Sequence, residues 1–312
     1  MTGHTLTGRR AGILLALATA CISGVAIWVN GHAVTHFTDA TVYTTAKDAV
    51  AGVLLIGIAV FWRETEAAPL TTGMSTRRRL IGLTAVAVIG GSVAFVLFFE
   101  GLARAQATQA SFIQKTLVIW VALLAVPLLK EKVQWPHLLA IGLLIGGQIW
   151  LVPAVGTVKF GVGEAMILAA TLLWAVEVIL VKKLLVGMSP RLLAAGRMGL
   201  GTALLFAWLA ISGKWGTFTS LDWTQWRWAL LTGLILTGYV GTWYAALSLA
   251  GAIDVTAVLV FGAVITAALS GAFDGVHVNA GGLTLIALGT ALIAALALRP
   301  RPAETPVKVV PT

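Results

Sequence analysis

The feature that most constrains this chain is a series of ten apolar segments, each close to the length that crosses a bilayer. About 20 consecutive apolar residues span the hydrocarbon core as an α-helix. Segments of this kind cover approximately residues 11–30, 41–62, 80–102, 107–129, 137–153, 163–182, 191–212, 228–248, 253–273 and 279–298. Because backbone N–H and C=O groups in hydrocarbon must be paired, each segment is predicted to be helical. We therefore expect an all-α polytopic membrane protein with ten transmembrane helices.

The charge distribution supports this expectation and predicts an orientation. Charged residues make up only 11% of the chain, against about 25% in soluble domains. With the N-terminus placed inside, fourteen of the 21 Lys and Arg residues fall on the inner side and four on the outer side. This bias predicts a multi-pass protein of the cell (plasma) membrane with both termini in the cytoplasm. The net charge of +9 therefore reports topology and not a nucleic-acid partner.

The two halves of the chain resemble each other. The stretch F-F-E-G-L-A-R-A-Q-A-T-Q-A at 98–110 aligns with W-Y-A-A-L-S-L-A-G-A-I-D-V at 243–255. Each half has five predicted spans, and an odd number means that the halves insert in opposite orientations. Inverted repeats of this kind place a substrate site near the midplane between them. We predict one five-helix repeat at 11–153 and a second at 163–298.

Outside the two repeats, the Pro-rich tail 299–312 is predicted to be disordered and cytoplasmic.

Several of these features resemble the ten-helix, EamA-type branch of the drug/metabolite transporter superfamily. The matching residues are a basic residue early in the second span of each half, an acidic residue closing the fourth, and glycines in the fifth: Lys47, Arg197, Glu131, Asp274, Gly142, Gly146, Gly281 and Gly289. The resemblance implies a secondary transporter, typically an exporter of amino acids, drugs or other metabolites. Proline is common early in the fourth span of that family, but Gln114-Lys115-Thr116 and Val260-Phe261-Gly262 stand there in this chain.

Lys115 is the most conspicuous candidate for the transport pathway. An ammonium inside hydrocarbon costs on the order of 3 kcal/mol on insertion scales, so Lys115 is expected to face protein or a water-filled cavity. Thr108, Ser111 and Lys115 fall at i, i+3 and i+7 and form one polar stripe. We expect this stripe, with Gln109 and Gln114 of the same helix, to meet the substrate. Lys115 either binds an anionic group or forms a structural ion pair.

The partners considered for Lys115 lie at similar depth. Lys47 and Asp48 stand about 10 Å below the outer end of the second predicted span, by the 1.5 Å rise per residue. Glu100 lies near the outer end of the third. All four residues are expected to share the outer half of one cavity, with Lys115 paired to Glu100 or Asp48 if it does not bind substrate. For Lys47 a structural role is favoured.

A second charged pair is predicted near the inner side. Glu177 in the sixth span and Arg197 in the seventh have similar depth, and an unpaired charge there is costly. They are expected to form an ion pair, or else an inner gate. If export is coupled to protons, Glu177 and Glu100 are the candidate carboxylates, because burial favours the protonated acid.

Aromatic side chains complete the predicted pathway. Tyr239 and Trp243 are i, i+4 in the eighth span, and Trp174 precedes Glu177 by three residues in the sixth. Stacking walls for an apolar or aromatic substrate have this pattern, and so does ordinary helix packing.

These observations predict an exporter of small metabolites such as amino acids, working by alternating access around a midplane cavity. The alternatives are an exchanger of phosphorylated or nucleotide-linked anions, a non-transporting membrane subunit, and a lipid-intermediate flippase. We predict no enzymatic activity, cofactor or metal site, and there is no Walker motif. The Gly142/Gly146 pair predicts a close helix contact, either within the protomer or in a homodimer.

Overall fold

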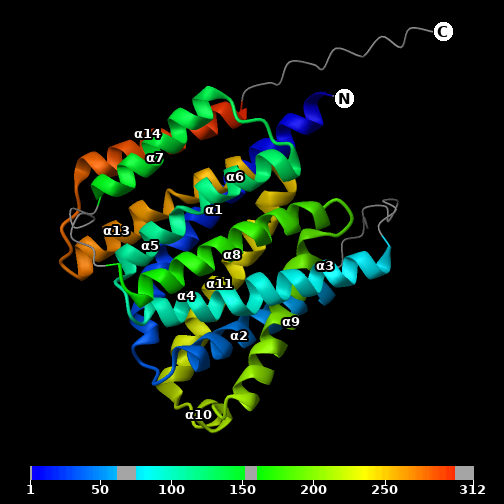
Figure 1. Cartoon of the computed structure of the whole chain (residues 1–312), viewed down its shortest axis with the longest axis vertical. Helices are drawn as coiled ribbons and strands as arrows, with labels where there is room; N and C mark the ends of the chain where they lie inside the picture. The colour runs from blue at the N-terminus through cyan, green and yellow to red at the C-terminus, as the bar shows by residue number, and fades with distance from the viewer. Residues whose placement is uncertain (1, 62–74, 152–159, 299–312) are drawn as a thin grey trace.

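The computed structural model describes residues 2–61, 75–151 and 160–298, and every regular element in these ranges is a helix. The helices lie side by side, and α1 begins at the end of the bundle where α14 ends (Figure 1). This end of the bundle is the terminal end. The elements are α1 (Thr2–Val34), α2 (Ala40–Phe61), α3 (Thr76–Val88), the π-helix η1 (Ile89–Val93), α4 (Ala94–Leu102), α5 (Ala107–Lys115), α6 (Leu117–Leu129), α7 (Trp135–Leu151), α8 (Val162–Leu184), α9 (Pro190–Ile211), α10 (Trp215–Thr219), α11 (Trp223–Leu249), α12 (Ala252–Leu259), α13 (Gly262–Phe273) and α14 (Ala280–Leu298).

Eight of the ten predicted spans are long and apolar enough to cross a membrane. They are Gly8–Val34, Ala40–Phe61, Thr76–Leu102, Ala107–Leu129, Val162–Leu184, Pro190–Ile211, Trp223–Leu249 and Ala252–Phe273. The last span of each predicted half, Trp135–Leu151 and Ala280–Leu296, is a shorter apolar helix. The predicted disordered tail at 299–312 lies outside the described residues.

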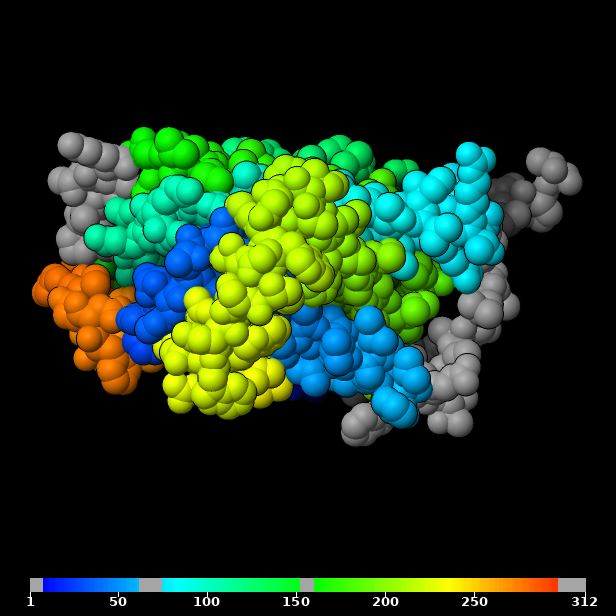
Figure 2. All heavy atoms as spheres, turned by 90° about the horizontal axis from the view of Figure 1, so that it is seen from below, coloured from blue at the N-terminus to red at the C-terminus, as the bar shows by residue number. Residues whose placement is uncertain are grey.

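The helix contacts repeat between the two halves. α2 packs against α9 and α7 against α14, so the second and fifth helices of each half contact their own counterparts. The first helix of each half packs against the third of the other, as α1 with α11 and α8 with α4. From the α10 side, yellow-green residues of α9 to α11 cover the middle of the surface between blue residues of the first half (Figure 2). Helices of one half therefore pack against helices of the other throughout the bundle.

The fourth span of each half is interrupted at the same place. α5 ends at Lys115 and α6 starts at Leu117, whereas α12 ends at Leu259 and α13 starts at Gly262. The second interruption lies against α1, because a Cβ on Gly24 would come within 2.5 Å of the Gly262 carbonyl oxygen. Both breaks lie where the sequence has no proline, although proline is common at this place in the family that the chain resembles.

Polar contacts tie the two halves together at the terminal end. Asp254 of α12 accepts a hydrogen bond from Arg9 at 2.9 Å and lies 3.5 Å from His137 Nε2. The Glu131 carboxylate accepts the N–H groups of Ala252 and Ile253 at 2.7 and 3.1 Å, where the N-terminal helix dipole favours an anion. All eight residues of α12 are buried, so α12 lies inside the bundle at this end.

Candidate transport site

A central cavity lies between the two halves. It encloses about 790 Å³ of empty space, counting the solvent at its opening. The wall combines side chains from α1, α2, α4, α5, α6, α8, α9 and α11. Seven aromatic residues contribute to it: Phe95, Phe98, Phe99, Trp174, Tyr239, Trp243 and Tyr244. The cavity can therefore hold a small molecule that has an apolar or aromatic part.

The aromatic rings that line the cavity include two groups in ring contact. Tyr239 and Trp243 are one turn apart on α11 and stack with centroids 6.1 Å apart and an interplanar angle of 10°. Trp174 of α8 meets Phe95 edge-on at 5.7 Å and Phe98 at 5.2 Å. The structure places Trp174, Tyr239 and Trp243 on the cavity, where the sequence predicted them.

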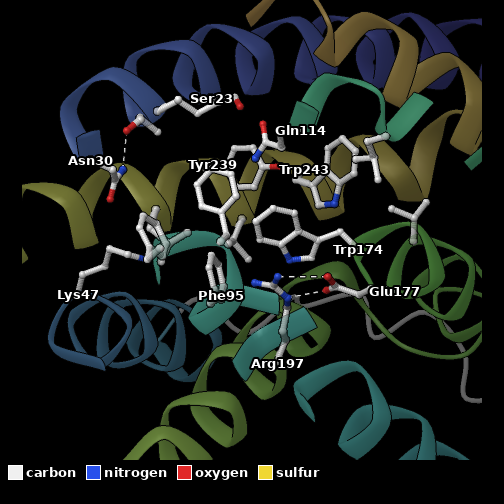
Figure 3. Close-up of a pocket in the computed structure, with 18 of the residues that line it drawn as sticks. Ser23, Asn30, Lys47, Phe95, Gln114, Trp174, Glu177, Arg197, Tyr239 and Trp243 are labelled. Atoms are coloured by element: carbon white, nitrogen blue, oxygen red, sulfur yellow. Dashed lines mark hydrogen bonds and ion pairs between the residues drawn. The ribbon is translucent and has the colours of Figure 1, made fainter. Parts of the chain in front are cut away.

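Arg197 and Glu177 lie on one wall as an ion pair (Figure 3). Arg197 Nε donates to Glu177 Oε1 at 2.5 Å and Nη2 donates to Oε2 at 3.2 Å. Tyr244 donates its hydroxyl proton to the same carboxylate at 2.7 Å, and Arg197 Nη2 also donates to the Gly90 carbonyl at 2.8 Å. Both charged residues are about 5% exposed. The ion pair predicted from the sequence is present, and its partners neutralise each other.

Gly90, in the π-helix η1, makes room for this pair. A Cβ at Gly90 would overlap the Glu177 carboxylate group. The π-helical turn and the missing side chain therefore allow the carboxylate to lie directly against the backbone.

The charge of Lys47, on α2, is also neutralised by a carboxylate. Its Nζ donates to Asp48 at 2.7 Å and lies 4.0 and 4.4 Å from the ring centroids of Phe99 and Phe95. Arg197 lies 4.9 Å from the same Phe95 ring. An aromatic face attracts a cation through its quadrupole. Lys47 lines the cavity, whereas its partner Asp48 lies behind it, fully buried.

Lys115 has no such carboxylate. Lys115 is 1% exposed. Its Nζ donates to Ser23 Oγ at 2.7 Å and to Gln114 Oε1 at 2.8 Å. Within residues 2–61, 75–151 and 160–298 its side chain forms no ion pair. Ser23 and Gln114 themselves line the cavity, opposite the Arg197–Glu177 wall, with the rings of Tyr239 and Trp174 between (Figure 3).

The predicted pairing of Lys115 with Glu100 or Asp48 is wrong. Glu100 accepts from Arg104 at 2.5 Å and from Thr41 at 3.0 Å, and Asp48 pairs with its own neighbour Lys47. Both carboxylates therefore have nearer cationic partners. The prediction that all four residues share one cavity is also wrong, because only Lys47 lines it.

The predicted polar stripe of α5 is divided between two cavities. Gln114 lines the central one, whereas Thr108 and Ser111 line a second, smaller cavity with Gln148 and Thr266. Gln109 is half-buried and lines neither. The helix α5 thus separates the two spaces, and its polar face does not open into the central cavity as a whole.

Several cavity residues were missed by sequence reasoning. Ser23 and Asn30 belong to a span without charges, so nothing in the sequence singled them out. The three phenylalanines of α4 carry a signal that was overlooked, because their i, i+3, i+4 spacing puts them on one helix face.

Among the described residues, no group of three or more His, Cys, Asp and Glu side chains could hold a metal ion. The charged residues that line the central cavity, Lys47, Glu177 and Arg197, are instead each paired with an opposite charge. A buried aromatic cavity with paired charges, formed by two similar sets of membrane-spanning helices, defines a polytopic membrane protein with an internal small-molecule site.

The chain belongs to the EamA-like transporter family, whose family model matches residues 10–152 and 161–298. A curated protein of Synechocystis sp., described as an uncharacterized transporter, is 28% identical over 193 residues. That match covers 58% of this chain and 54% of the relative, so the chain spans about half the length of the curated relative it matches. A solved crystal structure matches with a TM-score of 0.63 and 17% identity, covering 89% of this chain and 98% of that one. At this identity the likeness concerns the fold.

Proposed function

We propose that this protein is a secondary transporter that exports small metabolites such as amino acids by alternating access. The plasma membrane is the proposed location, with the terminal end of the bundle in the cytoplasm. The observation that carries the proposal is the central cavity, whose wall is built jointly by both halves. A site between two repeats that move against each other is how many secondary transporters expose a substrate to each side in turn.

Contacts at the two ends of the bundle support the alternating part of the proposal. At the terminal end Asp254, Arg9 and His137 join the halves through buried or nearly buried groups. At the opposite end Asp274 meets Trp28 at 2.8 Å and His32 at 3.2 Å, and the His32 and Asp274 side chains are 46% and 30% exposed. We propose that this structure is the state closed on the cytoplasmic side, and that the terminal contacts separate when that side opens.

The composition of the cavity wall favours an amphipathic substrate. Aromatic rings provide its apolar surface, whereas Ser23, Asn30 and Gln114 provide neutral polar atoms. Two of the three cations considered from the sequence, Lys47 and Arg197, are neutralised by carboxylates. The wall therefore favours an amino acid or similar metabolite over a phosphorylated or nucleotide-linked substrate.

Counterflow in proteoliposomes tests this proposal. Liposomes preloaded with unlabelled amino acids are expected to take up a trace of the same radiolabelled amino acids faster than protein-free liposomes. A variant that fills the cavity, Ala26→Trp, is expected to abolish counterflow, because Ala26 lines the wall. The control Val53→Trp, at a position 70% exposed on α2, is expected to keep it.

Size-exclusion profiles and thermal stability of both variants show whether they are folded, and Ala26→Leu provides a milder block. Wild-type protein without counterflow of any amino acid would contradict the proposed substrate class. Equal counterflow by folded Ala26→Trp and wild type would contradict the proposed site.

A further inference from the structure

The second cavity contains a buried amide without a protein partner. Gln148 of α7 is 1% exposed, and within the described ranges neither its Nε2 nor its Oε1 has a hydrogen-bond partner. The other polar lining groups are the hydroxyls of Thr108, Ser111 and Thr266. A buried polar group without a partner costs about 1–3 kcal/mol, and the cavity has room for about one water molecule. Four polar side chains around such a space are what a buried water requires.

Hydroxyl groups lead from this cavity toward Lys115. Ser111 Oγ donates to Thr266 Oγ1 at 3.5 Å, and Thr266 Oγ1 donates to the Gly24 carbonyl at 2.9 Å. The residue before Gly24 is Ser23, which accepts from Lys115 Nζ. Gly262, one turn before Thr266, lies against Lys115, since a Cβ there would be 3.2 Å from Lys115 Cε. One helical turn is about 5.4 Å, so the second cavity ends about that far from the Lys115 side chain.

The opposite side of Lys115 faces the central cavity through its two hydrogen-bond acceptors. Ser23 and Gln114 both line the central cavity, as Figure 3 shows for their side chains. Lys115 therefore lies between the two cavities, with neutral polar groups toward each.

No charged group on the elements around Lys115 is free to compensate its ammonium, within the residues that the structure describes. The helix α6 contains no ionisable residue, and α1 contains only Cys21 between Arg10 and His32. The carboxylates of α8, α4, α12 and the end of α13 are used elsewhere, in Glu177–Arg197, Glu100–Arg104, Asp254–Arg9 and Asp274–His32, while Glu164 at the start of α8 caps its own helix. A proton on Lys115 thus adds a charge that no carboxylate in the described part of the chain balances.

We propose that Lys115 is the proton-binding site of the transport cycle, and that the second cavity is its route to water. The Lys115 amine takes a proton from water that reaches the second cavity while one side of the protein is open. The ammonium gives this proton back to water after the two halves have moved and the other side is open. The ammonium attracts a carboxylate of the substrate in the central cavity, so that proton and carboxylate favour each other's binding. The inference rests on the proposed transport function and replaces Glu177 and Glu100 as the coupling groups.

Separating gradient-driven accumulation from counterflow tests this proposal. With radiolabelled amino acids as the probe, an inside-alkaline pH gradient is expected to drive accumulation in wild-type proteoliposomes. Lys115→Met is expected to lose this accumulation entirely and to weaken counterflow as well, because it removes the cation that attracts the carboxylate. Lys115→Arg is expected to lose the accumulation but to retain more counterflow than Lys115→Met, because a guanidinium keeps both its charge and its proton. It also guards against a folding defect caused by losing the cation.

Blocking the proton route gives a matched comparison. Gln148→Met is expected to slow gradient-driven accumulation without changing counterflow. The control Thr202→Val removes another buried hydroxyl without a partner among the described residues, at a position that lines neither cavity, and is expected to match wild type. Gradient-driven accumulation by Lys115→Met at the wild-type level would overturn the proposal.

A second measurement needs no substrate and so distinguishes failure of this proposal from failure of the proposed function. In protein labelled with ¹⁵N at the lysine Nζ, one resonance is expected to change between ammonium and amine with pH and to be absent from Lys115→Met. A Lys115 resonance that stays in one form wherever the protein is folded would overturn the proposal, even if counterflow is seen. The titrating resonance without amino-acid counterflow would support the proton site and contradict only the substrate class.

Discussion

Two buried cations, Arg197 and Lys115, lie near opposite walls of the same cavity but have different surroundings. The Arg197 guanidinium contacts the Glu177 carboxylate, a backbone carbonyl and the face of Phe95. The Lys115 ammonium contacts a serine hydroxyl and an amide oxygen. One charge is balanced within the protein and the other is balanced by no residue in the described part of the chain.

The difference separates structural from functional charge. Removing one member of a buried ion pair leaves the other uncompensated, which costs about 3–5 kcal/mol. Removing a buried charge that has no opposite charge relieves a desolvation cost. Substitutions at Arg197 and its partners are therefore expected to lower the stability of the protein. Substitutions at Lys115 are expected to lower its transport activity.

The largest effect is expected from Glu177→Gln. This substitution leaves Arg197 buried without its carboxylate, and we expect the free energy of unfolding to fall by about 3–5 kcal/mol. SDS titration of the purified protein in mixed micelles measures the change. The double variant Glu177→Gln/Arg197→Met is expected to recover part of the loss, and no recovery would show that the two residues do not act as a pair.

A smaller loss is expected from Gly90→Ala, because the added methyl group overlaps the Glu177 carboxylate. Overpacking of this kind typically costs about 1–3 kcal/mol. The matched control is Gly142→Ala, also in a helix, where nothing lies within 4 Å of the new Cβ. Equal unfolding profiles for the two variants would contradict the close approach of Glu177 to η1.

Tyr244→Phe is expected to have a moderate effect. It removes the hydroxyl that donates to Glu177 at 2.7 Å, and a hydrogen bond to a charged group is worth about 1.5–3 kcal/mol. Because the ion pair remains, we expect the lower part of this range. A loss as large as that of Glu177→Gln would mean that the hydroxyl, and not Arg197, is the main partner of the carboxylate.

The smallest effect on stability is expected from Lys115→Met. Methionine fills a similar volume and brings no charge, so we expect the free energy of unfolding to change by less than about 1 kcal/mol or to rise. A large loss of stability would place Lys115 in the same class as Arg197.

The sequence predicted the membrane-spanning fold well because hydropathy and length depend only on local composition. The breaks at Thr116 and Val260–Phe261 and the π-helix around Gly90 were not predicted, because they depend on the packing of other helices against them. The Glu177–Arg197 pair was predicted because equal depth in adjacent spans leaves few partners for either charge.

The error concerning Lys115 has a specific cause. Depth alone put Glu100 and Asp48 within reach of Lys115, but each carboxylate has a cation close by in the sequence. Arg104 follows Glu100 by four residues, and Lys47 is next to Asp48. The second cavity could not be predicted from the sequence either, because Ser111, Gln148 and Thr266 come from three separate helices.

Arg197 stabilises the scaffold, whereas Lys115 is proposed to act in transport. The free energies of unfolding of Arg197→Met and Lys115→Met, measured side by side in the same mixed micelles, test this division. We expect a loss of about 3–5 kcal/mol for Arg197→Met, since Glu177 is left unpaired, and no comparable loss for Lys115→Met. Equal losses in the two variants would show that the two cations do not differ in role.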